Sequence, residues 1–428
     1  MVCFTQSSGW ESGMRELLLA RPFSEKFKFI LGFVLLTSFA GLGIGIARLA
    51  TTLYAVDLHA SEFQLGVIAS AQSVGILFMS LPVGILIHKY HPMRLFMLGS
   101  LLGGVIYAVT PLVRSAEFLI FCTVLVSFCM PLRFISLNSV FMQQLEVLGN
   151  ARAGWFRGVH MMGFFLLGPV AAAYLIDALH YVGTFLVVAA SFLITILLAP
   201  LALSSFKSDD RHAPKLEWQE IKSQLLLLKE DLVLRRTSVI EFLNHAVMAF
   251  FGFFIVVIAI QSFGFSATVA ASLLTLHGAV FVATLFTTGA LISYLGHKRF
   301  YQVSFGISAV ALFVLAIPQW SLGLWIGAVC LAAGLGMLHI VNFTMYAQAG
   351  KKHGTGRVSG LTALVGPAGG FFGSFLGGWL GHLFGLQILF LPMGLVFLWL
   401  IWFVYDLPSI VEKQAVELNV LPELESEI

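Results

Sequence analysis

Charged residues are scarce in this chain of 428 residues, because Asp, Glu, Lys and Arg together make up only 11% of it. An ordinary soluble domain has about 25% charged residues. So few ionic groups cannot coat a globular surface of this size, which excludes a water-soluble fold. Hydrophobic residues reach 59%, so the lipid bilayer must be the main solvent. The net charge of +3 is small, and we expect no nucleic-acid partner.

Cysteine is rare, and the common cofactor motifs are absent. The four cysteines show no metal-ligand spacing, so we expect neither disulfides nor a metal site. No loop of the form G-x-x-x-x-G-K-[ST] occurs, which argues against ATP as the energy source. No set of nucleophile, base and orienting group can be assembled, so we expect neither enzyme activity nor a cofactor. The first apolar run is too long for the core of a signal peptide, and we expect no cleaved leader.

Long apolar runs are what the sequence has instead. About 20 apolar residues cross a hydrocarbon core of about 30 Å as a helix, whereas barrel strands alternate over about ten residues. We therefore predict an all-α membrane protein with twelve transmembrane helices. The runs lie near 29–56, 64–87, 94–113, 117–142, 158–178, 182–205, 239–261, 267–292, 300–318, 321–347, 358–384 and 387–405.

The basic residues indicate which side of the membrane each loop faces. Of the 24 Lys and Arg residues, all but Arg48, Arg114 and Arg133 fall on one side if the chain crosses twelve times. Basic residues concentrate on the cytoplasmic side, so we predict that both termini are cytoplasmic. We expect a multi-pass protein of the bacterial inner membrane.

A polar stretch at the centre divides the chain into two halves. We predict a cytoplasmic arm at 1–26, six-helix bundles at 27–205 and 238–405, a linker at 206–237 and a cytoplasmic tail at 406–428. Apolar residues in the linker recur at steps of three and four, which favours an amphipathic helix on the inner membrane surface. A solvated spacer is the alternative. The apolar residues are Trp218, Ile221, Leu225, Leu228 and Leu232.

An internal repeat relates the two halves. The segment GILIHKYHPMRLF begins at Gly84, and GALISYLGHKRFY begins at Gly289, 205 residues later. Each starts on Gly at the end of a span, passes through a short turn and re-enters the membrane after a basic residue. Two halves built alike imply two helical bundles about a pseudo-twofold axis, with a binding site where they meet near the bilayer midplane.

Twelve spans in a six-plus-six arrangement, a long central loop and the repeated basic turn resemble the major facilitator superfamily of transporters. The resemblance covers essentially residues 27–405. It implies alternating access by two bundles that rock about a central site, with gating by the turn residues. These are Gly84, Lys89 and Arg94 in the first copy and Gly289, Lys298 and Arg299 in the second. His88 and Ser293 stand where the family has an acid, so the charge latch of this turn departs from the family pattern.

Two further features are similar to the drug-exporting branch of the superfamily. That branch has an arginine in its fourth span, and CMPLRFISLN supplies Arg133, although Ser136 and Leu137 stand where Gln and Gly would follow. Its fifth span carries glycines beside a proline. The matching residues are Gly168 and Pro169, repeated as Gly366 and Pro367 in the second half. This resemblance implies export coupled to protons.

Charged side chains inside the spans are the first candidates for a binding site. A charge near the bilayer centre costs about 2.5 to 3.5 kcal/mol on insertion scales, so it commonly faces an aqueous cavity. Arg133 and Arg48 have no carboxylate at a similar depth, which favours a negatively charged or strongly hydrogen-bond-accepting solute. The alternative is that each arginine only fixes helix packing. We expect the cavity to be lined by Arg133, Arg48, Thr52, Ser136 and Gln72.

Histidines within the spans are candidates for proton coupling, because histidine exchanges a proton near neutral pH. Glu241 and His245 lie one helical turn apart, and His277 occupies the repeat position of Gln72. The alternative is that the histidines are hydrogen-bonded packing residues. The candidate coupling residues are Glu241, His245, His277 and His339.

Glycine recurs every fourth residue along the eleventh predicted span. Such a surface lets a neighbouring helix approach closely, and between two bundles it also permits sliding. Prolines break helices locally where water or neighbours satisfy the freed carbonyls. We expect packing or gating roles for Gly373, Gly377 and Gly381, together with Pro169 and Pro367.

Together these features predict a monomeric secondary active transporter that exports a small anionic or amphipathic solute in exchange for protons. Uptake of an organic anion or a metal chelate is a second interpretation, and a non-transporting sensor or scaffold on the same fold is a third. The expected partners are the small-molecule solute, protons and the lipid bilayer.

Overall fold

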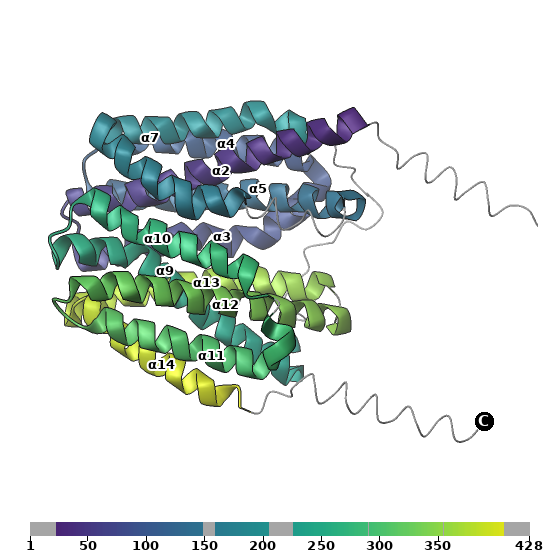
Figure 1. Cartoon of the computed structure of the whole chain (residues 1–428). Coiled ribbons are helices and arrows are strands. Elements are labelled where there is room, and N and C mark those ends of the chain that lie inside the picture. The colour runs from purple at the N-terminus through teal and green to yellow at the C-terminus, as the bar shows by residue number, and fades with distance from the viewer. Residues whose placement is uncertain (1–22, 149–158, 205–225, 290, 354, 406–428) are drawn as a thin grey trace, which may run out of the picture.

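Long apolar helices make up nearly all of the fold (Figure 1). The computed structural model describes residues 23–148, 159–204, 226–289, 291–353 and 355–405. The long helices are α2 (Phe23–Asp57), α3 (Glu62–Tyr90), α4 (Pro92–Val109), α5 (Ala116–Leu148), α7 (Gly168–Leu203), α9 (Leu232–Gln261), α10 (Ala267–Thr287), α11 (Leu291–Ala316), α12 (Ser321–His353), α13 (Thr355–Phe384) and α14 (Phe390–Phe403). Short turns of other helix types are η1 (Thr110–Leu112), η2 (Gly163–Leu167) and η4 (Gln387–Leu389).

Ten helices of the described chain are long and apolar enough to cross a membrane. One of them, Val159–Leu203, has 45 residues and is broken at His180, whose φ is 55°, so it crosses twice. The shorter apolar segment Gln387–Phe403 supplies a further crossing. The described helices therefore account for twelve crossings, and the predicted all-α membrane fold is confirmed.

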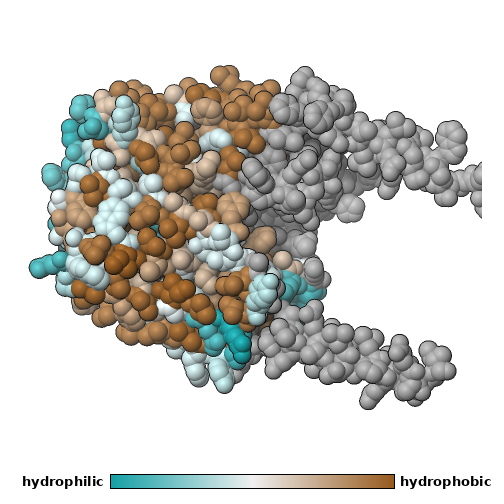
Figure 2. Space-filling model, in the orientation of Figure 1, coloured by the Kyte–Doolittle hydropathy of each residue, from teal (hydrophilic) through white to brown (hydrophobic). Residues whose placement is uncertain are grey.

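The outside of the bundle is apolar. Figure 2 shows hydrophobic side chains over much of the face in view, with hydrophilic ones gathered mainly toward its ends. Leu112 and Leu197 are 72% and 77% exposed. Exposing apolar surface to water costs about 25 cal/mol per Å², so these side chains are stable only against lipid chains.

The two halves of the chain lie side by side. We call the described residues from 23 to 204 the N-terminal half and those from 226 to 405 the C-terminal half. In Figure 1 the purple and blue helices of the N-terminal half lie together on one side of the molecule. The halves meet where α3 packs on α13, α2 on α9, and α10 on α7 and η2.

The 205-residue offset of the repeat extends into the helices. Phe185 and Phe390 are separated by this offset, as are Phe192 and Phe397, and each of the four is at most 1% exposed. Equivalent residues therefore occupy equivalent places in the two cores, and the halves can be compared position by position.

Only the end of the predicted amphipathic linker helix lies within the described residues. Residues 226–230 are helical, and Leu227 and Leu228 pack with Tyr346 and Leu361 of the C-terminal half. Residues 205–225 lie outside the described part, so the surface helix stays a prediction. The arm at 1–22 and the tail at 406–428 lie outside it as well.

A charged cluster fixes the start of α9. The Asp231 carboxylate accepts a hydrogen bond from the Leu234 N–H at 2.9 Å, and it lies 2.8 Å from both Lys352 Nζ and His353 Nε2 at the end of α12. Burial raises the pKa of Asp231, but the hydrogen bonds from Lys352, the Leu234 N–H and His353 outweigh burial and hold the pKa well below its usual range. The cluster therefore ties α9 to α12 through an ionised carboxylate.

We expect Asp231→Ala to lower the melting temperature of the purified protein more than Asp231→Asn does. Asn keeps an acceptor for the Leu234 N–H, and an N-cap is worth about 1 kcal/mol. Because the fold favours the ionised carboxylate, its contribution is present above the unfolded-state pKa of about 3.9 and is lost as the pH falls below that value. Thermal unfolding at a series of pH values checks both points. Equal melting temperatures for the two variants would contradict the role of the cap.

Candidate functional site

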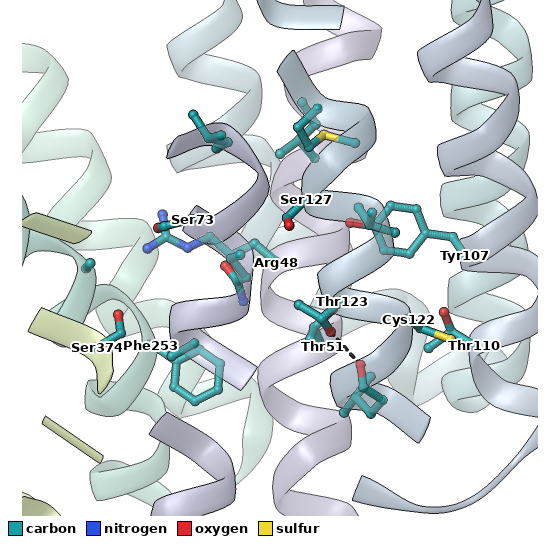
Figure 3. Close-up of a pocket in the computed structure, with 18 of the residues that line it drawn as sticks. Arg48, Thr51, Ser73, Tyr107, Thr110, Cys122, Thr123, Ser127, Phe253 and Ser374 are labelled. Atoms are coloured by element: carbon teal, nitrogen blue, oxygen red, sulfur yellow. Dashed lines mark hydrogen bonds between the residues drawn. The ribbon is translucent and has the colours of Figure 1, made fainter. Parts of the chain in front are cut away.

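A cavity of about 230 Å³ lies between the two halves. The N-terminal half supplies most of its wall, and the C-terminal half contributes Ala249 and Phe253 of α9 and Ser374 of α13. Figure 3 shows Arg48 and Tyr107 of the N-terminal half around the same space as Phe253 and Ser374. A cavity walled by both halves lies at the place where the repeat predicts a binding site.

Arg48 is the only charged residue among those that line the cavity. Its Cζ lies 5.4 Å from the centre of the Phe164 ring. Gly252 of α9 leaves room for the guanidinium, because a Cβ there would come within 2.5 Å of Nη2. No carboxylate in the wall compensates the charge, so the cavity favours a ligand that brings a negative charge.

Polar side chains of α2, α3 and α5 surround Arg48. Gln72 lines the cavity, and its Nε2 has no acceptor among the described residues. Ser127 of α5 accepts the Gly75 N–H at 3.0 Å, which holds α3 close against α5 and keeps Gln72 in the wall. An unpaired amide donor beside a guanidinium strengthens the preference for an accepting ligand. The other polar lining residues are Thr51, Ser73, Tyr107, Thr110, Cys122, Thr123 and Ser374.

His277 lies beside Arg48 but outside the main cavity. The two residues share the wall of a second cavity of about 30 Å³, which has room for about two waters. His277 Nδ1 lies 3.1 Å from the carbonyl oxygen of Ala328, and its ring packs on Phe251 with centroids 4.4 Å apart. The imidazole is thus anchored in the C-terminal half.

Arg133, which we expected to face the cavity, lines neither of these two cavities. Its side chain is buried inside the N-terminal half, where Cζ lies 3.6 Å from the centre of the Phe192 ring and 5.5 Å from that of Phe96. Its Nη2 donates to the Thr195 hydroxyl at 3.3 Å. The polar stripe of α5 does point Arg133 inward, but rings from α4 and α7 cover it, which the sequence of α5 alone does not reveal.

Thr52 and Ser136 do not line the cavity either. The Thr52 hydroxyl donates to the carbonyl oxygen of Arg48 at 3.1 Å, and its neighbour Thr51 faces the cavity instead. Ser136 is fully buried one turn beyond Arg133. Adjacent helical residues differ in direction by about 100°, so an error of one residue moves a side chain from the cavity into helix packing.

A buried polar network occupies the C-terminal half. Glu241 of α9 accepts a short hydrogen bond from Asn342 Nδ2 of α12, and Asn342 Oδ1 accepts one from the Tyr301 hydroxyl of α11 at 2.7 Å. The second carboxylate oxygen of Glu241 lies 3.3 Å from His245 Nδ1. Three helices are therefore joined through the Asn342 amide.

The N-terminal half has apolar residues at the equivalent positions. Leu36, Phe96 and Leu137 lie 205 residues before Glu241, Tyr301 and Asn342, and all three belong to one buried hydrophobic cluster. Apolar packing satisfies the same positions in one half, so packing alone does not require a carboxylate in the other. A buried carboxylate costs stability unless it is well paired, which marks the network as a functional candidate.

Three of the predicted coupling residues lie together in this network. His245 is one helical turn, about 6 Å, from the cavity-lining Ala249 on the same helix. Gly366 of α13 makes room for the imidazole, because a Cβ there would come within 3.1 Å of Nε2. The His339 ring lies 6.5 Å from that of His245. Glu241, His245 and His339 therefore form one cluster close to the cavity.

The predicted glycine stripe of α13 packs within the C-terminal half. A Cβ at Gly373 or Gly377 would come within 2.4 Å of an atom of α9, and one at Gly381 within 2.4 Å of the segment before α14. A different glycine of α13 makes the contact with the N-terminal half, because a Cβ at Gly378 would lie 2.3 Å from the Cα of Gly66 in α3. Any sliding between the halves therefore involves Gly378 and not the predicted stripe.

The halves touch at the end of the interface where α3 begins. Beside the glycine contact, the rings of Phe63 and Phe375 lie 6.3 Å apart, and a carboxylate oxygen of Glu62 lies 3.6 Å from His382 Nδ1. This end is thus closed by direct contact between α3 and α13.

The residues of the repeated turn lie at the end of α3, in the first turn of α4 and around the start of α11. Gly84 and Lys89 fall within the last part of α3, and Lys298 Nζ lies 4.1 Å from the centre of the Tyr405 ring. Arg94, Gly289 and Arg299 are exposed. Lys298 thus contacts an aromatic ring, in keeping with the missing acid of this turn.

The fifth crossing is distorted next to its proline. Gly168 lets this crossing approach α2, since a Cβ there would lie 2.6 Å from the Cα of Gly45. Pro169 stands where the π-helix η2 passes into α7, and its missing N–H removes one hydrogen bond from this helix. Phe164 of η2 lines both cavities, and π-helical turns often mark functional sites. In the other half, Pro367 lies inside α13.

Comparison with known proteins supplies the family. The sequence profile of the Major Facilitator Superfamily matches residues 33–259 and 237–422. No curated protein sequence matches the chain. The crystal structure of the nucleoside transporter NupG is similar, with 13% identity, a TM-score of 0.71, and coverage of 88% of this chain and 99% of that one. A bacterial homologue of the human lysosomal transporter Spinster, in an inward-facing and unoccupied conformation, is also similar, with 13% identity, a TM-score of 0.65, and coverage of 90% and 96%. At these identities the likeness concerns the fold alone.

We expect Cys122, which lines the cavity, to react faster with a negatively charged methanethiosulfonate than with a positively charged one of similar size. Arg48 is the only charge in the wall, so an anionic reagent should be concentrated severalfold. Arg48→Gln should remove the preference. Mass spectrometry of the labelled peptide measures both rates, with Cys122→Ser as the control for the other cysteines. Equal rates in the wild type would contradict an anion-selective cavity.

Proposed function

Because the chain belongs to the Major Facilitator Superfamily, we propose that it is a secondary active transporter that exports a small anionic solute in exchange for protons. The single observation that carries the anion is Arg48, which stands in a cavity walled by both halves and without a carboxylate. Arg133, which the sequence favours for this role, is covered by aromatic rings and does not contribute to the site.

The volume of the cavity narrows the class of solute. Pockets for drug-sized ligands measure about 300 to 1,000 Å³, and this cavity has about 230 Å³. The apolar lining residues Ile44, Ile76, Val126 and Met130 favour a short apolar body on the anion. These features support a compact organic carboxylate over a metal chelate or a large amphipathic drug. Uptake of the same kind of anion is the second candidate, since the cavity is equally suited to either direction.

The Glu241–His245 pair supports coupling to protons. The Glu241 carboxylate is already hydrogen-bonded by Asn342, and the Asn342 oxygen is occupied by Tyr301, so no ring of free oxygens is left for a metal cation. A proton on His245, which is half-buried, would neutralise the pair. Loss of one negative charge about one helical turn from the cavity wall changes the field that a bound anion experiences.

Alternating access is supported by the contact between the halves. The α3–α13 interface includes a glycine contact, one aromatic pair and one exposed ion pair. An exposed ion pair contributes about 0 to 1 kcal/mol, so the ion pair adds little to the cost of separating this end. We place the protein in the bacterial cytoplasmic membrane as a monomer, with both termini cytoplasmic and this closed end on the outer side.

We expect proteoliposomes containing the protein to move radiolabelled nicotinate or phenylpyruvate when a pH gradient is imposed. Arg48→Gln should reduce this flux at least tenfold, because the charge partner of the carboxylate is lost. Glu241→Gln should keep anion exchange at equal pH and lose accumulation driven by the gradient. Reversing the gradient distinguishes export from uptake. Nicotinamide, the neutral amide of nicotinate and nearly the same size, is the control, and nicotinamide flux that equals nicotinate flux in the wild type would sink the anion assignment.

We expect spin labels at Phe63→Cys and Phe375→Cys to report two distances by pulsed electron resonance, in a background in which the native cysteines are replaced by serine. The short distance corresponds to the contact between the rings, and a longer one to separation of α3 from α13. Gly378→Leu should raise the longer population, because the added side chain meets the backbone of α3. A single short distance in all samples, including Gly378→Leu, would contradict alternating access at this interface.

A further inference from the structure

The environment of Arg133 satisfies only part of its guanidinium. The side chain is 2% exposed, and the rings of Phe192 and Phe96 lie against it. Aromatic rings stabilise the flat faces of a guanidinium, whereas its five N–H groups, which lie in the plane, need acceptors. Nη2 has Thr195, but Nε and Nη1 have no acceptor among the described residues.

Two buried hydroxyl groups on the nearby turns of α4 and α5 also lack partners among the described residues. Ser136 lies one turn along α5, and Ser100 of α4 follows Gly99, at which a Cβ would come within 3.2 Å of Arg133 Cγ. Both serines are fully buried, and neither Oγ has a partner among the described residues. Unlike the lining of a cation site, this group of side chains offers N–H and O–H donors and no carboxylate.

The equivalent positions in the C-terminal half are occupied by apolar residues. The residues 205 positions after Ser100, Arg133, Ser136 and Thr195 are Phe305, Leu338, Val341 and Leu400, and all four are fully buried. Serine is smaller than phenylalanine or valine, and threonine is smaller than leucine. Arginine is larger than leucine, but the four N-terminal residues together still have less side-chain volume, and more hydrogen-bond donors, than their four apolar counterparts.

We propose that this layer binds a small inorganic anion, of the size of chloride, inside the N-terminal half. Burying a guanidinium without a counter-charge is strongly unfavourable, and an anion held by Arg133 Nε and Nη1 with the two serine hydroxyls would supply that counter-charge. The site is distinct from the solute cavity. It is connected to the cavity wall through Tyr107, whose ring packs edge-on against Phe192 with centroids 5.4 Å apart. The anion is a resident ligand that stiffens this wall and is not the transported solute.

The test measures halide-dependent thermal stability of the purified protein at constant ionic strength, with chloride or bromide replacing gluconate. We expect a saturable rise of about 2 °C or more in the melting temperature of the wild type. Arg133→Leu, which installs the residue of the equivalent position in the other half, should abolish the rise. Arg48→Gln, which changes the solute cavity only, should keep it.

A second variant keeps the charge and weakens the site. Ser136→Val should retain Arg133 and raise the half-saturating bromide concentration severalfold, so the proposal remains testable if Arg133→Leu does not fold. Absence of a halide effect in the wild type would overturn the proposal. So would a rise that survives Arg133→Leu, or one that disappears in Arg48→Gln, because either result places the anion elsewhere.

Discussion

The cost of keeping an ionic side chain away from water governs this structure more than any other interaction. The chain has few charges, and the membrane-spanning helices carry Arg48, Arg133 and Glu241 among them. Each is treated differently: Arg48 opens on a cavity, Arg133 lies against aromatic rings, and Glu241 is hydrogen-bonded by Asn342. An uncompensated charge in this environment costs several kcal/mol, which is why we propose a solute at Arg48, an anion at Arg133 and a proton at Glu241 and His245.

Because of the internal repeat, each of these sites can be compared with the equivalent positions in the other half of the same molecule. The two halves share a core architecture, in which Phe192 and Phe397 are both buried at equivalent places. Within that shared core, the N-terminal half has the positively charged Arg133, and the C-terminal half has the negatively charged Glu241. In each case the equivalent residue of the other half is apolar: Leu338 corresponds to Arg133, and Leu36 corresponds to Glu241.

Much of the fold was predictable from the sequence, because the lengths of the apolar runs and the positions of the basic residues are properties of the linear sequence. The break at His180 separates two predicted spans, and α13 begins and ends close to its predicted limits. The candidate site was predicted less well. Gln72 and Arg48 line the cavity, whereas Arg133, Thr52 and Ser136 do not. Tyr107 and Ser374 gave no signal of their own, because one lies in an apolar run and the other in a glycine-rich one.

The sequence by itself determined that the chain is embedded in a bilayer, that it crosses the bilayer twelve times, and that its second half repeats the first at an offset of 205 residues. These properties depend only on composition and periodicity. Only the tertiary structure decided which polar residues face the cavity. A helix presents a new direction every 100° or so, and whether that direction meets water or a ring depends on a neighbouring helix. Phe96 and Phe192, distant from Arg133 in sequence, cover it, while Gly252 leaves Arg48 the room it needs.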